Sequence, residues 1–147
     1  MRWWVVTRDK PGLLWALLDH FVSNATVAFE GRLAALGLSD VVGAASEETL
    51  ALGRQTRKPR LDFVTLPGTP ETIRILKKRL AAPGLFRYRG PIVHVQIEHA
   101  GQLVLLAGDY FHRECVSVFS PVSEQLLEDL RTSGVIRSYR ADDRRRR

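Results

Sequence analysis

The sequence has a single cysteine, Cys115, and no apolar run long enough to cross a membrane. One thiol cannot form a disulfide within the chain, which fits a reducing compartment. The longest uninterrupted apolar run covers residues 13–18, whereas a membrane-spanning helix needs about 20 apolar residues. The N-terminal residues also lack the long apolar stretch and the small-residue cleavage site of a secretory signal. We therefore expect a cytoplasmic protein that does not enter the membrane.

Motifs that hold phosphates or metals are also missing. The sequence contains neither a Walker loop nor a Gly-x-Gly-x-x-Gly turn, so it offers no cradle for nucleotide phosphates. Neither Cys-x-x-Cys nor His-x-x-x-His spacing occurs. His94 and His99 are an odd number of positions apart, which places them on opposite faces of a regular strand. The sequence thus predicts no metal site and no cofactor.

The densest group of reactive side chains is Asp-Tyr-Phe-His-Arg-Glu-Cys at residues 109–115. His112 and Cys115 are the types that form a thiolate nucleophile, because an imidazolium lowers the pKa of a neighbouring thiol. They stand three positions apart across a loop-to-strand junction, however, and no clear set of oxyanion donors follows. Cys115 also alternates with Ser117 and Phe119, which is typical of a packed strand. We interpret Cys115 as structural and expect no enzyme, with a Cys/His enzyme as the third alternative.

The net charge of +6 is unevenly distributed along the chain. The last eight residues contribute +3 of it, and we expect residues 140–147 to be a disordered basic tail. The other basic side chains that could form a patch are Arg54, Arg57, Lys58, Arg60, Arg74, Lys77, Lys78, Arg79, Arg87 and Arg89. Such a patch would suit phosphate or an acidic partner. Interspersed acidic residues and the scarcity of nearby aromatics favour a solvated face, so nucleic acid is not the expected partner.

The clearest organised stretch is a β-α-β unit at residues 3–31. Aromatic and β-branched residues at 3–7 predict a strand, and Asp9 and Pro11 suit the start of a helix. The predicted buried face of that helix is Leu14, Leu17, Leu18 and Phe21, at helical spacing. Residues 26–30 then alternate as a second strand.

Later segments repeat this pattern after a long irregular connection at residues 32–60. In that connection we expect one short helix from Ser46 to Leu52, and connections of this length are often functional. The other predicted strands are 61–66, 92–98, 102–107, 115–119 and 135–139. The other predicted helices begin at Thr69–Pro70 and at Ser120–Pro121.

The element order predicts a single α+β domain over residues 1–139. The first six elements follow the order of a ferredoxin-like split βαβ fold, an antiparallel sheet with both helices on one face. We expect the strands of residues 3–98 to be neighbours in that sheet. The long middle loop and a C-terminal β-hairpin/α extension at 99–139 would elaborate it.

The sequence Asp-Lys-Pro-Gly-Leu-Leu at residues 9–14 resembles the turn that begins the first helix of ACT domains, small ferredoxin-like regulatory modules. With the element order, the resemblance covers residues 3–98, although the connection at 32–60 is longer than an ACT hairpin. In that family the turn helps to hold an amino acid or similar small ligand, usually between two paired domains. The resemblance therefore implies a sensor of an amino-acid-like ligand, held by Asp9, Lys10, Gly12 and Leu13.

Two binding functions follow, and the sequence leaves both open. The first is the ACT-like regulatory sensor. The second is a module that binds a protein partner, such as a bacterial inhibitor or immunity-type protein. Its contact residues would be Arg57, Lys58, Tyr110, Phe111, His112 and Arg113, which are types found at interfaces or in a basic loop. The adjacent Trp3 and Trp4 point to opposite faces of a strand, and the need to cover the outer ring predicts a homodimer.

Overall fold

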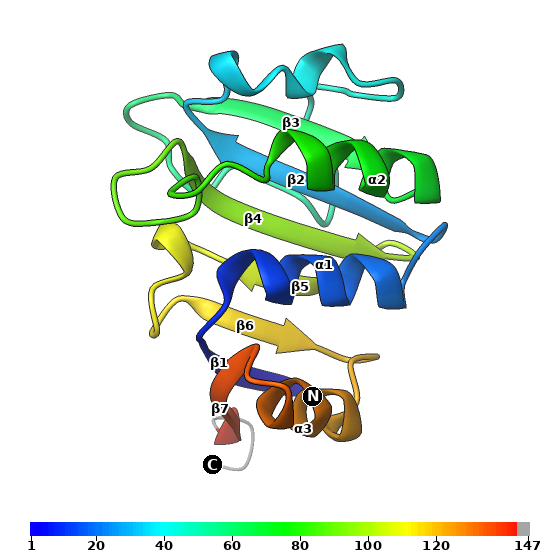
Figure 1. Cartoon of the computed structure of the whole chain (residues 1–147), viewed down its shortest axis with the longest axis vertical. Helices are drawn as coiled ribbons and strands as arrows, with labels where there is room; N and C mark the ends of the chain where they lie inside the picture. The colour runs from blue at the N-terminus through cyan, green and yellow to red at the C-terminus, as the bar shows by residue number, and fades with distance from the viewer. Residues whose placement is uncertain (144–147) are drawn as a thin grey trace.

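The computed structural model describes residues 1–143, and the end of the predicted tail, 144–147, lies outside them. In this part of the chain one open antiparallel sheet has the order β3-β2-β4-β5-β6-β1-β7 (Figure 1). Its strands are β1 (Arg2–Thr7), β2 (Ala25–Gly31), β3 (Asp62–Pro67), β4 (Ile92–His99), β5 (Gln102–Ala107), β6 (Val116–Phe119) and β7 (Ile136–Ala141). The helices are α1 (Lys10–His20), α2 (Pro70–Arg79) and α3 (Glu124–Thr132), with 3-10 turns η1 (Ala34–Leu36), η2 (Leu38–Asp40) and η3 (Asp109–Phe111). The predicted α+β class is confirmed.

The order of the strands differs from the ferredoxin-like expectation. β1 pairs with β6 and β7, so β5 and β6 lie between β1 and β4. The expectation that the strands of residues 3–98 are neighbours is therefore wrong for β1, and the ferredoxin-like arrangement is not confirmed. The reason is the tight β4–β5 hairpin, in which β5 pairs with the edge of β4 that β2 leaves free, so that edge is not available to β1.

The helices cover one face of the sheet, which holds the main core. Figure 1 shows α1 and α2 in front of the sheet, with α3 in front of its lower end. Asp9 and Thr69 cap α1 and α2 as the sequence suggests, accepting hydrogen bonds from Gly12 N and Thr72 N. The buried residues of α1 are Leu13, Leu14, Leu17 and Leu18. They pack against strand residues such as Val27, Phe29, Val95 and Ile97.

Three local predictions need correction. The helix predicted at 46–52 does not form, because Ala45 pairs with Thr65 as extended backbone and Leu52 is drawn into a small core of its own. α3 begins at Glu124 because Ser123, not Ser120, accepts the hydrogen bond from Leu126 N. β7 continues through residues 140 and 141, which therefore belong to the sheet and not to a tail.

The two adjacent tryptophans are both covered within the chain. The ring of Trp3 packs edge-on against Tyr139, with centroids 5.6 Å apart. The guanidinium of Arg2 lies 4.2 Å from the centroid of the Trp4 ring, a cation–π contact. Cover for the outer tryptophan thus comes from the same chain, and the homodimer stays a prediction.

Leu17 has no exposed surface, so its side chain is part of the main core. We expect Leu17→Ala to lower the free energy of unfolding by about 2–5 kcal/mol, because it removes buried methyl groups and leaves a cavity. The measurement is a urea denaturation curve. Val22→Ala, at a side chain that is 39% exposed, is the control and should cost about 0.5 kcal/mol or less. Equal losses in the two variants would contradict the packing described.

Candidate functional site

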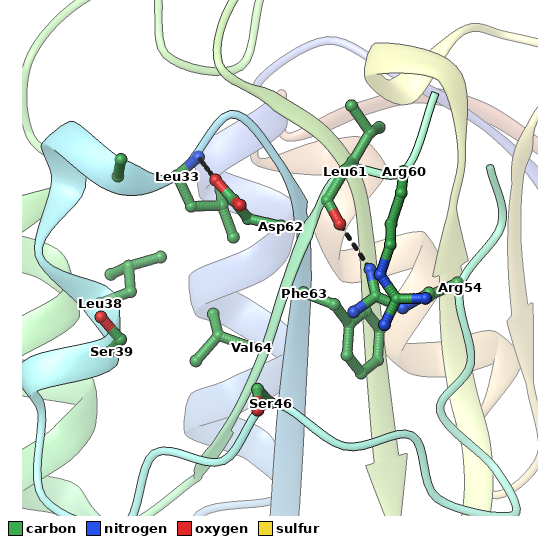
Figure 2. Close-up of a pocket in the computed structure, with 11 residues that line it drawn as sticks. Leu33, Leu38, Ser39, Ser46, Arg54, Arg60, Leu61, Asp62, Phe63 and Val64 are labelled. Carbon is green, nitrogen blue, oxygen red and sulfur yellow. Dashed lines mark hydrogen bonds between the residues drawn. The ribbon is translucent and has the colours of Figure 1, made fainter. Parts of the chain in front are cut away.

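A cleft of about 450 Å³ opens at the outer edge of β3. Figure 2 shows it along that edge, with Leu33, Leu38 and Ser39 on one side of β3 and Arg54, Arg60 and Phe63 on the other. Its lining residues are Leu33, Ala34, Leu38, Ser39, Ser46, Arg54, Arg60, Leu61, Asp62, Phe63 and Val64. All of them belong either to β3 with the residue before it or to the connection at 32–60. The cleft thus combines an apolar wall with a basic one.

The apolar wall is held in place by three hydrogen bonds, one to the side chain of Asp62 and two between backbone groups. Leu33 N donates to Asp62 Oδ2 at 3.0 Å, which fixes the start of the connection beside β3. Ala45 then pairs with Thr65 through two backbone hydrogen bonds of 2.8 and 3.0 Å. Leu33 and Leu38 are buried between these two attachments. This part of the wall is therefore well defined without a ligand.

The basic wall consists of Arg54 and Arg60. Arg54 Nη1 donates to the carbonyl of Leu61 at 2.5 Å, and its guanidinium lies 5.2 Å from the centroid of the Phe63 ring. Arg60 is exposed and forms no hydrogen bond or ion pair within residues 1–143. Asp62 is the one acidic residue of the lining, so the lining carries more positive than negative charge. One arginine is held firmly, and the other is available to a ligand.

Arg54 is positioned by a segment that we call the strap, residues 52–56, which crosses the sheet face opposite the helices. Its apolar anchor is Leu52, which packs against Ala28 and Phe63. Its polar anchors are side chains of β2 and β4. The carboxylate of Glu30 accepts hydrogen bonds from Gln55 N (2.7 Å) and Thr56 N (3.2 Å). Gln96 exchanges two more with the backbone of Gly53. These contacts fix the backbone on both sides of Arg54.

His94 fastens the end of the strap. Its Nδ1 accepts a hydrogen bond from Asp109 N at 3.0 Å, and its Nε2 lies 2.7 Å from Thr56 Oγ1. Since a backbone amide can only donate, Nδ1 carries no proton and Nε2–H donates to the hydroxyl. Burial lowers the pKa of His94, and the nearby carboxylates of Glu30 and Asp109 oppose that shift. The neutral ring is thus the form that fits both partners.

The residues that the ACT resemblance assigns to a ligand have partners inside the chain. Asp9 Oδ1 accepts from Gly12 N at 2.9 Å, and a Cβ at Gly12 would lie 2.4 Å from Asp9 Oδ2. Lys10 Nζ donates to the carbonyl of Phe86 at 3.2 Å, and burial lowers its pKa. Leu13 has no exposed surface. These four residues start and pack α1, and they lie together without lining the cleft.

The residues predicted to contact a partner divide into two groups. Arg57 and Lys58, just after the strap, are exposed, as are His112 and Arg113. Tyr110 is half-buried and packs edge-on against Tyr88, whereas Phe111 is only 4% exposed and packs against Phe86. Residues 109–111 all have positive φ, and this left-handed turn directs the Phe111 ring into the core. Phe111 is therefore part of the core and not of the surface.

The remaining reactive groups are held in unreactive states or stand apart. Burial, with the carboxylates of Asp109 and Glu114, raises the pKa of Cys115 and keeps it a thiol. His112 Nδ1 accepts from Glu114 N at 3.2 Å. Within residues 1–143, no three His, Cys, Asp or Glu side chains are grouped to hold a metal ion. None of the helices in that range combines the length and apolar character needed to span a bilayer.

The state of His94 gives the folded protein a specific pH dependence. Its pKa is lower in the folded than in the unfolded chain, so as the pH falls the unfolded chain takes up the proton first. The contribution of His94 to stability is complete above about pH 6.5 and decreases as the pH falls through that value. We expect the urea midpoint to fall between about pH 7.5 and 5.5 and His94→Gln to reduce that fall. An unchanged pH dependence in the variant would assign it to other groups.

The sequence indicates Arg54 and Arg60 only as part of a basic run, and it gives no sign of the cleft or of the roles of Glu30 and Gln96. In the predicted strand at residues 92–98, Gln96 alternates with Val95 and Ile97, which places it on the face away from the main core but gives no reason to expect it to be buried. The one signal was the length of the connection at 32–60, which carries most of the cleft lining. No protein family model, curated protein or solved structure matches the chain.

Proposed function

We propose that this protein binds a small, amino-acid-like carboxylate in the cleft at the edge of β3 and does not transform it. The observation that supports this most is the pairing of Arg54 and Arg60 with an apolar wall in one cleft of about 450 Å³. Pockets for small ligands typically have volumes of about 300–1,000 Å³, with apolar walls and a few polar groups that fix orientation. The cleft has this composition.

The two arginines account for the choice of a carboxylate. A guanidinium presents parallel N–H donors that match the two oxygens of a carboxylate. Arg54 uses Nη1 for the carbonyl of Leu61 and keeps its other donors, and Arg60 keeps all of its own. Leu33, Leu38 and Val64 on the other wall would receive an apolar side chain. A ligand with a carboxylate and an apolar group close together fits both walls.

Binding without turnover agrees with the side chains of the site. The cleft lining has neither histidine nor cysteine, and its two serines, Ser39 and Ser46, are both exposed. A nucleophilic serine needs a base within hydrogen-bond reach. The thiol state of Cys115 and the two hydrogen bonds of His94 leave neither group poised for such a role.

This proposal keeps the class of ligand that the ACT resemblance implies and moves the site. In the ACT-like version the ligand would lie at Asp9, Lys10, Gly12 and Leu13. Their polar groups already bond within the chain, and Leu13 is buried. In the cleft, by contrast, Arg60 has no partner within the described residues. The guanidinium of Arg60, which is unpaired in residues 1–143, therefore favours the cleft as the site of the ligand carboxylate.

A second candidate function is binding of a protein partner beside the Tyr88–Tyr110 pair. Tyr88 is 70% exposed although it is a large aromatic side chain, and the guanidinium of Arg89 lies 5.5 Å from its ring centroid. Exposed tyrosine and arginine are the types most enriched at the centre of interfaces. Arg113 is exposed on the neighbouring loop. This surface is distinct from the cleft lining.

Calorimetric titration with leucine, phenylalanine and their N-acetyl derivatives tests the first function. We expect at least one to bind, and Arg60→Glu to weaken it at least tenfold because it replaces attraction by repulsion. Arg137→Glu makes the same charge change on β7, at the opposite edge of the sheet, and should leave affinity unchanged. Affinity lost with Lys10→Glu but kept with Arg60→Glu would favour the ACT-like site. Absence of binding by the whole panel would refute the proposal.

The second function predicts a discrete covalent adduct when Tyr88 is replaced by photo-reactive p-benzoylphenylalanine and cells are irradiated. The adduct should disappear with Arg89→Glu, because this change reverses the charge of the guanidinium beside the Tyr88 ring and would repel an acidic partner. The same photo-reactive residue in place of Arg137 is the control and should give no such species. A partner that cross-links equally at both positions would argue against this surface.

A further inference from the structure

The outer edge of β3 is only partly paired. In an antiparallel sheet, the N–H and C=O of one residue point to the same side, and successive residues alternate sides. Thr65 directs both groups outward, because it exchanges two hydrogen bonds with Ala45. Phe63, two residues earlier, must therefore also direct its N–H and C=O outward, away from β2 and into the cleft. The carbonyl of Leu61 fits this alternation, since it accepts from Arg54.

The backbone groups of Phe63 have no partner on that side among the described residues. Phe63 lines the cleft and is only 4% exposed, so its backbone groups are shielded from open solvent. A buried backbone donor or acceptor without a partner costs about 1–3 kcal/mol. A second extended chain in the cleft would supply both missing hydrogen bonds, as strand addition does at other sheet edges.

We propose that the cleft binds the C-terminal residues of a peptide chain by strand addition, with the terminal carboxylate at Arg54 and Arg60. This inference rests on the proposed function and specifies its ligand. The Ala45 bridge occupies the edge at Thr65, so the space that is left lies opposite residues 61–64. At about 3.3 Å per residue, that length accommodates about three residues.

The charge at one end fixes the direction of the peptide. A strand antiparallel to β3 runs from the Thr65 end towards Leu61, and its C-terminus then reaches Arg54 and Arg60. A parallel strand would instead bring its positively charged N-terminus to the arginines, which is repulsive. Only the antiparallel direction both pairs the peptide with the backbone of β3 and brings its negatively charged C-terminus to the two arginines.

The faces of the strand specify the side chains. Val64 and Asp62 lie on the side of Leu33 and Leu38, and Phe63 lies on the other side with Arg54 (Figure 2). The peptide residue opposite Phe63 is the penultimate one when the carboxylate is level with Leu61. The terminal residue and the residue two before it then face the apolar wall. A sequence ending in Val-Ser-Val meets these requirements.

The test is calorimetric titration of the full chain with acetyl-Val-Ser-Val carrying a free carboxylate. We expect the C-terminal amide of this peptide, and the free acid with Arg60→Glu, to bind at least tenfold more weakly. Arg137→Glu should have no effect. Extending the peptide at its N-terminus should change affinity less than twofold, because the Ala45 bridge ends the available edge.

Two methylated peptides separate strand addition from simple recognition of a carboxylate. N-methylation of the penultimate serine removes the donor to the carbonyl of Phe63 and should weaken binding at least fivefold. N-methylation of the terminal valine affects an amide that points away from β3 and should be tolerated. Equal tolerance of both, or N-acetylvaline binding as tightly as the tripeptide, would overturn strand addition and leave the proposed function intact. Failure of every carboxylate to bind would refute both.

Discussion

The buried carboxylate of Glu30 is the group on which the arrangement of residues 32–60 depends. Only 1% of this residue is exposed, in the interior of the sheet, between β3 and β4. Burial of a carboxylate is costly unless its oxygens accept hydrogen bonds, and here the amides of Gln55 and Thr56 supply them. The hydrogen bonds from the strap therefore offset the cost of burying Glu30, and the same hydrogen bonds hold the strap on the sheet.

The strap turns a long loop into two walls. From the end of β2 the connection runs along the helix side of β3, touches the edge at Thr65, and then crosses to the opposite face. The cleft lies where its two halves separate around the edge. Arg54 depends on this path, because Glu30, Gln96 and Glu48 hold the backbone on either side of it. The charged wall of the site is thus fixed by polar contacts on the far side of the sheet.

Much of the fold could be predicted because it depends on local patterns. The β-α-β start, the caps Asp9 and Thr69, and the β4–β5 hairpin are set by residues close in sequence. The place of β1 is different, since its partners β6 and β7 come more than a hundred residues later. The sequence of residues 46–52 favours a helix because Ser46 can cap one that ends at Leu52, and no local pattern indicates the pairing of Ala45 with Thr65. Glu30 and His94 become meaningful only once β2 and β4 are known to be neighbours.

The two edges of the sheet are protected in different ways, and the difference points back to the cleft. An exposed edge is a template for unwanted pairing, and charged side chains or proline are common defences. β7 carries exposed Arg137 and Arg140 along its edge. β3 has Pro67 at one end and the Ala45 bridge next to it, which leaves the backbone of Phe63 uncovered only inside a cleft. There, loops and charges limit what can approach. An edge that is closed to general association but open over about three residues is what selective recognition of a short chain end requires.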